Sequence, residues 1–154
     1  MKSINNRFHD NIVTAFKEYY IEELKRKIRR TKDANAMECR FNGGTVPYGY
    51  RINAEHHYVV NRLTAPIVLE IYTRYVNGQL ICDIQRELSK QNVSLSTARI
   101  RNILKNRNYI GEYHYDGIDI PDGIPMIIPA DLFQLAQETM ESRRTKRERA
   151  VSED

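Results

Sequence analysis

Cysteine is scarce in this sequence of 154 residues, and long apolar runs are absent. Its two cysteines, Cys39 and Cys82, stand far apart and form no CxxC pair, so they do not predict a zinc site, and we expect reduced thiols. No apolar stretch approaches the ~20 residues that a membrane span requires, and the amino terminus has no apolar signal core. These absences predict a cytoplasmic protein with no membrane association, no metal and no other cofactor.

Recognisable catalytic motifs are missing as well. No serine or cysteine lies in a nucleophile elbow, and no glycine-rich phosphate loop is present. Glu22 and Glu23 are adjacent carboxylates in a helical stretch, where such pairs are more often solvated than catalytic. We therefore expect that this chain is not itself an enzyme and that its function is binding.

Proline and glycine are absent from Ser3 to Ala36, and apolar residues recur there at every fourth position. The repeating residues are Phe8, Ile12, Phe16, Tyr20, Leu24 and Ile28. This periodicity predicts one helix on the order of 45–50 Å long, more than a domain of this size needs for its own core. The apolar stripe either packs on the same domain or, in its first half, contacts a surface outside this chain.

The second half of this helix is strongly basic. Residues 25–32 hold six lysines and arginines among eight positions, with no acidic residue between them. Such a run is usually a solvated face, but its density favours contact with phosphates. We predict DNA contacts from five of these residues, which are Lys25, Arg26, Arg29, Arg30 and Lys32. The net charge of +4 permits a polyanionic partner without requiring one.

The middle of the chain alternates helix and hairpin signals. Residues 46–60 predict a hairpin, a helix follows from Thr64 to Gly78, and Asp-Gly pairs at 116–117 and 122–123 predict further hairpins. A last helix should start near Ala130. The sequence thus predicts an α+β fold, with a long amino-terminal helix over 1–38, a compact domain over 39–145 and a basic, disordered tail over 146–154.

Two short helices in this domain have the outline of a helix-turn-helix. The first carries Ile84 and Leu88, Asn92 suits a left-handed turn, and Ser96 is a candidate N-cap for the second. No aspartate or glutamate occurs from Leu95 to Tyr109, in a chain that has 20 of them. At 100° per residue, Ala98, Asn102 and Lys105 lie opposite the apolar side of the second helix. Such a face, with arginines on its flanks, suits a major groove, because arginine can form two hydrogen bonds with guanine and asparagine can form two with adenine.

The candidate DNA-binding residues outside the long helix follow from this face and from the glycine-containing segment before the first hairpin. They are Arg40, Ser96, Thr97, Arg99, Arg101, Asn102, Lys105, Asn106 and Arg107. The segment around Arg40–Gly44 is expected to enter the minor groove, since glycines permit close approach, whereas residues 96–106 should read the adjacent major groove.

The order of these motifs resembles the recombinase domain of the large serine recombinases, which include phage integrases and transposon resolvases. The resembling segments are "PYGYR" at 47–51, "APIVLEIYTRYVNG" at 65–78, "ICDIQRELSKQNV" at 81–93, "STARIRNILKNRNYIGE" at 96–112 and "IIPADLFQLAQ" at 127–137. The chain departs from the family pattern at Asn92, where glycine is usual, at Arg107, where proline is usual, and at Glu112, where a basic residue is common.

The resemblance implies sequence-specific binding of a double-stranded DNA attachment site in a mobile element. Strand exchange would be carried out by a serine-containing catalytic domain that this chain lacks, and the long helix would contact that domain or partner subunits. Two alternatives remain open at this point. One is a winged-helix-like transcription regulator that dimerises through the long helix, and the other is a protein-interaction module of a mobile element.

Overall fold

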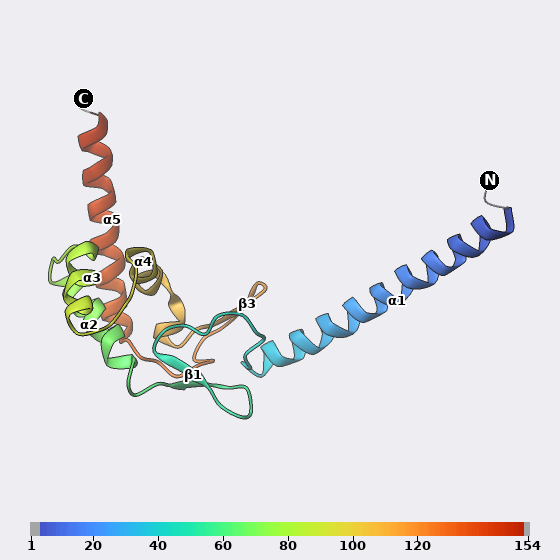
Figure 1. Cartoon of the computed structure of the whole chain (residues 1–154). Coiled ribbons are helices and arrows are strands. Elements are labelled where there is room, and N and C mark those ends of the chain that lie inside the picture. Colours follow the sequence, from blue (N-terminus) through green and yellow to red (C-terminus); the bar gives the residue numbers. More distant parts are fainter. Residues whose placement is uncertain (1–3, 153–154) are drawn as a thin grey trace. The chain divides into compact units, whose positions relative to one another are not determined.

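The protein is described by a computed structural model, which covers the backbone of residues 4–152 and the side chains of residue 7 and residues 9–145. The chain divides into two compact units, Met1–Glu38 and Cys39–Asp154. Figure 1 shows the helices and strands of each unit. Helices and two small antiparallel sheets make up the described chain, so the predicted α+β class is confirmed. None of the described helices is long and apolar enough to cross a bilayer.

In the first unit, helix α1 runs from Ile4 to Met37, which confirms the predicted long helix. Its apolar stripe is exposed, with Phe16 at 73% and Tyr20 at 69% of full accessibility. The side chain of Phe8, the first residue of the predicted stripe, lies outside the described residues.

Two hairpins supply the β-structure of the second unit. In the first, β1 (Tyr50–Ile52) pairs antiparallel with β2 (Tyr58–Val60), as the sequence predicts. In the second, β3 (Tyr113–Tyr115) pairs with β4 (Ile118–Ile120) around Asp116-Gly117, where both residues have positive φ.

The hairpin predicted at Asp122-Gly123 is wrong, because this pair forms a turn that joins no two paired strands. Gly123 has an ordinary φ, and its need for glycine is steric. A Cβ there would lie 2.7 Å from both Cys39 Sγ and Tyr113 Cβ.

Four α-helices form the body of the second unit: α2 (Ala65–Val76), α3 (Ile81–Lys90), α4 (Thr97–Lys105) and α5 (Ala130–Ser152), with a 3₁₀ turn η1 (Arg107–Ile110) after α4. Helix α2 packs along α5, and α4 contacts α2, α3 and α5 (Figure 1). Buried aliphatic residues from all four α-helices meet in the core with Tyr72 and Tyr109. Helix α5 continues to Ser152, through most of the segment for which the sequence predicts a disordered tail.

Helix α2 begins without a side-chain cap. Thr64 occupies the N-cap position, but its side chain makes no capping hydrogen bond. The carbonyl of Asn61 accepts hydrogen bonds from the amides of Thr64 and Ala65, and Asn61 Oδ1 accepts one from Leu63 N at 3.0 Å. Asn61 therefore pairs the amides of the residues that lead into α2.

Candidate nucleic-acid interface

Helix α4 is defined by its cap and by its buried side. Ser96 Oγ accepts a hydrogen bond from Arg99 N at 3.2 Å, which confirms Ser96 as the N-cap. Ile100, Ile103 and Leu104 are buried, as their spacing predicts. Asn92, in the turn between α3 and α4, has φ of 61°, so the left-handed turn is also confirmed.

The opposite side of α4 is exposed and carries no acid. Its exposed residues are Ala98, Arg99, Arg101, Asn102 and Lys105. Because Ala98 has only a methyl group, the helix backbone can approach a partner closely at this position. The three cations and one amide around it offer donors that point outward, as a polyanionic groove requires.

Two side chains from other helices hold α4 from its buried side. Tyr72 Oη donates to the carbonyl of Ile103 at 2.7 Å, and Gln137 Nε2 donates to the carbonyl of Leu104 at 2.6 Å. The last carbonyls of a helix have no partners within the helix, so these bonds fix the carboxyl end of α4 against α2 and α5. Helices α2 and α5 therefore hold α4 in position behind its exposed face.

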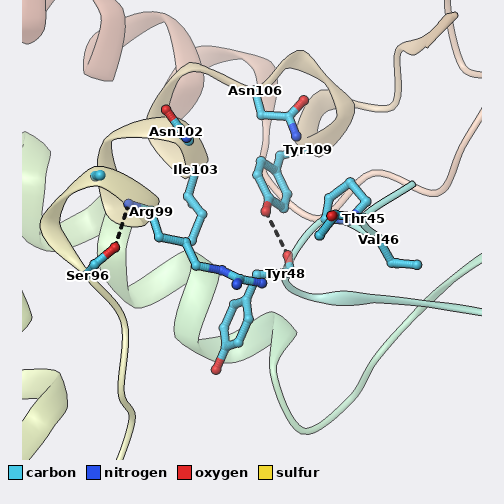
Figure 2. Close-up of a pocket in the computed structure, with 11 residues that line it drawn as sticks. Thr45, Val46, Tyr48, Ser96, Arg99, Asn102, Ile103, Asn106 and Tyr109 are labelled. Carbon is cyan, nitrogen blue, oxygen red and sulfur yellow. Dashed lines mark hydrogen bonds between the residues drawn. The ribbon is translucent and has the colours of Figure 1, made fainter.

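A groove of about 420 Å³ separates α4 from the segment Thr45–Tyr48. Figure 2 shows Arg99 extending from α4 toward the ring of Tyr48. The Arg99 guanidinium carbon lies 5.8 Å from the centre of that ring, within the range of a cation–π contact. The tyrosine thus directs Arg99 along one flank of α4.

Tyr109 fixes the far wall of this groove. Its hydroxyl donates to the carbonyl of Tyr48 at 2.7 Å, and its ring stacks on Tyr50 with centroids 5.8 Å apart. Tyr50 Oη in turn lies within hydrogen-bond distance of the carbonyls of Asn108 and Pro125. Burial raises the pKa of Tyr109 and of Tyr50, so both hydroxyls remain donors over the physiological range.

The segment before the first hairpin is built as the sequence suggests. Gly43 and Gly44 have φ of +95° and +94°, which residues with a Cβ rarely adopt, and nothing lies within 4 Å of an added Cβ. The backbone of Arg40 forms an isolated antiparallel β-bridge with that of His57. The carbonyl of Arg40 accepts a hydrogen bond from Tyr113 Oη at 2.8 Å. Burial raises the pKa of Tyr113 to about 12. Arg40 thus stands at an anchored end of an open glycine segment.

Asn106 and Arg107 have local partners that the sequence analysis did not foresee. Asn106 Oδ1 accepts a hydrogen bond from Asn108 N at 3.0 Å and caps η1. Arg107 forms a two-point ion pair with Glu112, in which Nη2 and Oε1 are 2.6 Å apart. This pair raises the pKa of Arg107 and lowers that of Glu112.

The basic residues of α1 lie in the other unit. At about 100° per residue, Lys25, Arg29 and Lys32 share one side of α1, and Arg26 and Arg30 adjoin it. Lys25 pairs with Glu22 at 3.2 Å and Arg26 pairs with Glu23 at 2.9 Å. Exposed pairs of this kind contribute little to stability, so they are easily exchanged for a phosphate.

The structure brings together Ser96, Arg99, Asn102 and Asn106 around the groove, and it places Arg101 on the other flank of α4. The sequence analysis missed Tyr48 and Tyr109 as parts of this site, because their contacts join positions 51 and 61 residues apart.

Within the described residues, no group of three or more histidine, cysteine, aspartate or glutamate side chains could hold a metal ion.

Comparison with known proteins places this geometry in a family. Two solved structures share the fold: a crystal structure of an LSR–DNA complex, with TM-score 0.65 and 21% identity, and a structure concerned with the Listeria innocua prophage attP site, with TM-score 0.64 and 21% identity. Each match covers 75% of this chain, which spans 38% and 51% of the respective relatives.

No curated protein matches the chain. The family model described as Recombinase matches residues 62–143, which include α2, α3, α4 and both strands of the second hairpin. This match covers more than half of the sequence, and the chain therefore belongs to the Recombinase family.

Proposed function

We propose that this chain binds double-stranded DNA sequence-specifically, as the attachment-site-reading part of a site-specific serine recombinase. The observation that carries the proposal is the exposed, acid-free side of α4, which has a buried apolar side behind it and side-chain bonds from α2 and α5 at its carboxyl end. Membership of the Recombinase family and the similarity of the fold to a protein solved with DNA support it. The winged-helix regulator and the pure interaction module are not favoured by these findings.

In this proposal α4 lies in the major groove. Arg101 and Asn102 face base edges, where arginine recognises guanine and asparagine recognises adenine. Arg99, steered by Tyr48, reaches a base or a backbone phosphate along the flank of the helix. Ser96 and Thr97 bring the amino end of α4 toward a phosphate, which the free amides of a helix start favour.

Two further segments complete the proposed contact. The basic residues of α1 neutralise phosphates along the backbone, and the glycine segment beside Arg40 enters the minor groove. Strand cutting and rejoining belong in this proposal to a catalytic serine domain of the parent recombinase. The exposed stripe of α1 contacts that domain or a partner subunit.

The salt dependence of duplex binding tests this proposal. If about six phosphates are neutralised, affinity should fall roughly 10³-fold when salt rises fourfold. A protein-interaction module would bind no duplex at low salt, and that result would refute the proposal. A regulator would form a stable dimer without DNA, which sizing at several concentrations would reveal.

A further inference from the structure

The second unit carries an arginine–carboxylate ion pair just beyond the end of α4. Arg107, beyond the end of α4, is held by the carboxylate of Glu112 through both Nε and Nη2. The Arg107 side chain is 64% exposed, whereas that of Glu112 is 29% exposed. Glu112 is therefore the more buried partner, and the Arg107 side chain stays largely open to solvent.

The hydrogen-bond inventory of the guanidinium shows what this pairing leaves available. Arginine has five N–H donors, and Glu112 takes one from Nε and one from Nη2. Both hydrogens of Nη1 and one of Nη2 are not used by Glu112. A hydrogen from Nη1 and the remaining one from Nη2 form the parallel fork that matches O6 and N7 of guanine.

The position of Arg107 fits a reader of bases more closely than a phosphate contact. Arg107 lines a hollow of about 640 Å³ together with Lys105, which belongs to the exposed side of α4. Glu112 and Asp119 line the same hollow, and Asp119 pairs with His114 across the second hairpin. Two carboxylates offset the two cations there, so the local field attracts a phosphate weakly and directional hydrogen bonds matter more.

We propose that Arg107 reads a guanine at the end of the surface formed by α4, and that Glu112 is the positioning residue that holds its guanidinium for this contact. An arginine that is already held loses less side-chain freedom on binding, which raises affinity for the matching base. The inference rests on the proposed DNA-binding function and adds to it one specificity-determining residue and its support.

Selection from a library of randomised duplexes tests the proposed DNA-binding function and the role of Arg107 separately. The full chain should enrich a motif, and Arg107→Ala should lose a guanine preference at one position of that motif, with roughly 5- to 150-fold weaker binding to the enriched duplex. Glu112→Gln should weaken the same preference. If the unmodified chain enriches no motif and binds no duplex, the proposed function fails and the inference fails with it.

A double-mutant cycle on the enriched duplex separates positioning from a simple change of charge. If Glu112 acts through Arg107, Glu112→Gln weakens binding in the unmodified chain and has no effect in the Arg107→Ala background. If Glu112 only repels the backbone, its replacement tightens binding equally in both backgrounds, which overturns the inference. An Arg107→Ala variant that keeps the guanine preference overturns it as well.

Glu70→Gln is the matched control. Glu70 pairs with Arg74 Nε at 2.7 Å on α2, so this variant makes the same charge change at another arginine–carboxylate pair. It should leave the enriched motif unchanged. Thermal melting of each variant shows whether it is folded, and the comparison of preferences among folded variants decides the outcome.

Discussion

Replacement of Tyr109 by phenylalanine tests how the groove beside α4 is held together. The ring is 1% exposed and would keep its packing, so the change removes only the hydroxyl that donates to the Tyr48 carbonyl. A typical hydrogen bond contributes about 0.5–1.5 kcal/mol to stability. At pH 7 we therefore expect Tyr109→Phe to lower the free energy of unfolding by about 1 kcal/mol, which corresponds to about 4 °C in Tm for a unit of this size.

The same variant has a distinctive pH dependence. Burial raises the pKa of Tyr109 in the folded state, so above pH 10 the unfolded chain releases this proton while the folded chain retains it. The unfolded state then binds fewer protons, and stability falls as pH rises. At pH 11 the lost stability is about 1.4 kcal/mol for a tyrosine whose unfolded pKa is about 10. Phenylalanine has no such proton, so the difference between the two proteins should vanish near pH 11.

Denaturant unfolding between pH 7 and pH 11 measures both effects, with linear extrapolation at each pH. Tyr20→Phe, at an exposed position of α1, is the control and should match the unmodified protein at pH 7. A stability difference for Tyr109→Phe that stays constant from pH 7 to pH 11 would refute the reasoning, because the hydroxyl would then titrate alike in both states.

The remaining predictions concern α4, α1 and the packing of the first hairpin. Arg101→Ala should weaken binding to the preferred duplex by roughly 1–3 kcal/mol and relax the choice of one base, whereas equal losses on all duplexes in a binding titration would assign Arg101 to a phosphate. Lys25→Ala should lower affinity for all duplexes alike and reduce the slope of log affinity against log salt by about one; an unchanged slope would mean that Lys25 reaches no phosphate. Gly49→Ala should destabilise the second unit by about 2–4 kcal/mol, because Gly49 has φ of +96° and the added Cβ would lie 2.9 Å from Val68 Cγ2 and 3.1 Å from Ile127 Cδ1. Unchanged thermal unfolding of that variant would contradict the close packing.

Some features of the site follow from local sequence alone. The regular spacing of apolar residues from Phe8 to Ile28 predicts α1 because a helix repeats every 3.6 residues, and the spacing of Ile100, Ile103 and Leu104 predicts the buried side of α4 for the same reason. Ser96 and Asn92 also act through their own or neighbouring backbone, by capping and by a left-handed turn. Such signals depend on a few consecutive residues, so they can be interpreted before the fold is known.

Other features depend on which distant residues the fold brings together. The hydroxyls of Tyr72, Tyr109 and Tyr113 bond backbone carbonyls 31, 61 and 73 residues away. Asp122-Gly123 has the composition of a hairpin turn, yet Gly123 is required by the close approach of Cys39 and Tyr113.

Neighbouring residues encode the α-helices, the first two hairpins and the acid-free face of α4, so these features are predicted without the fold. The contact of Arg99 with the Tyr48 ring and the ion pair of Glu112 with Arg107 depend on the folded chain. These contacts need particular distances and angles between side chains, and composition and spacing along the chain do not specify them.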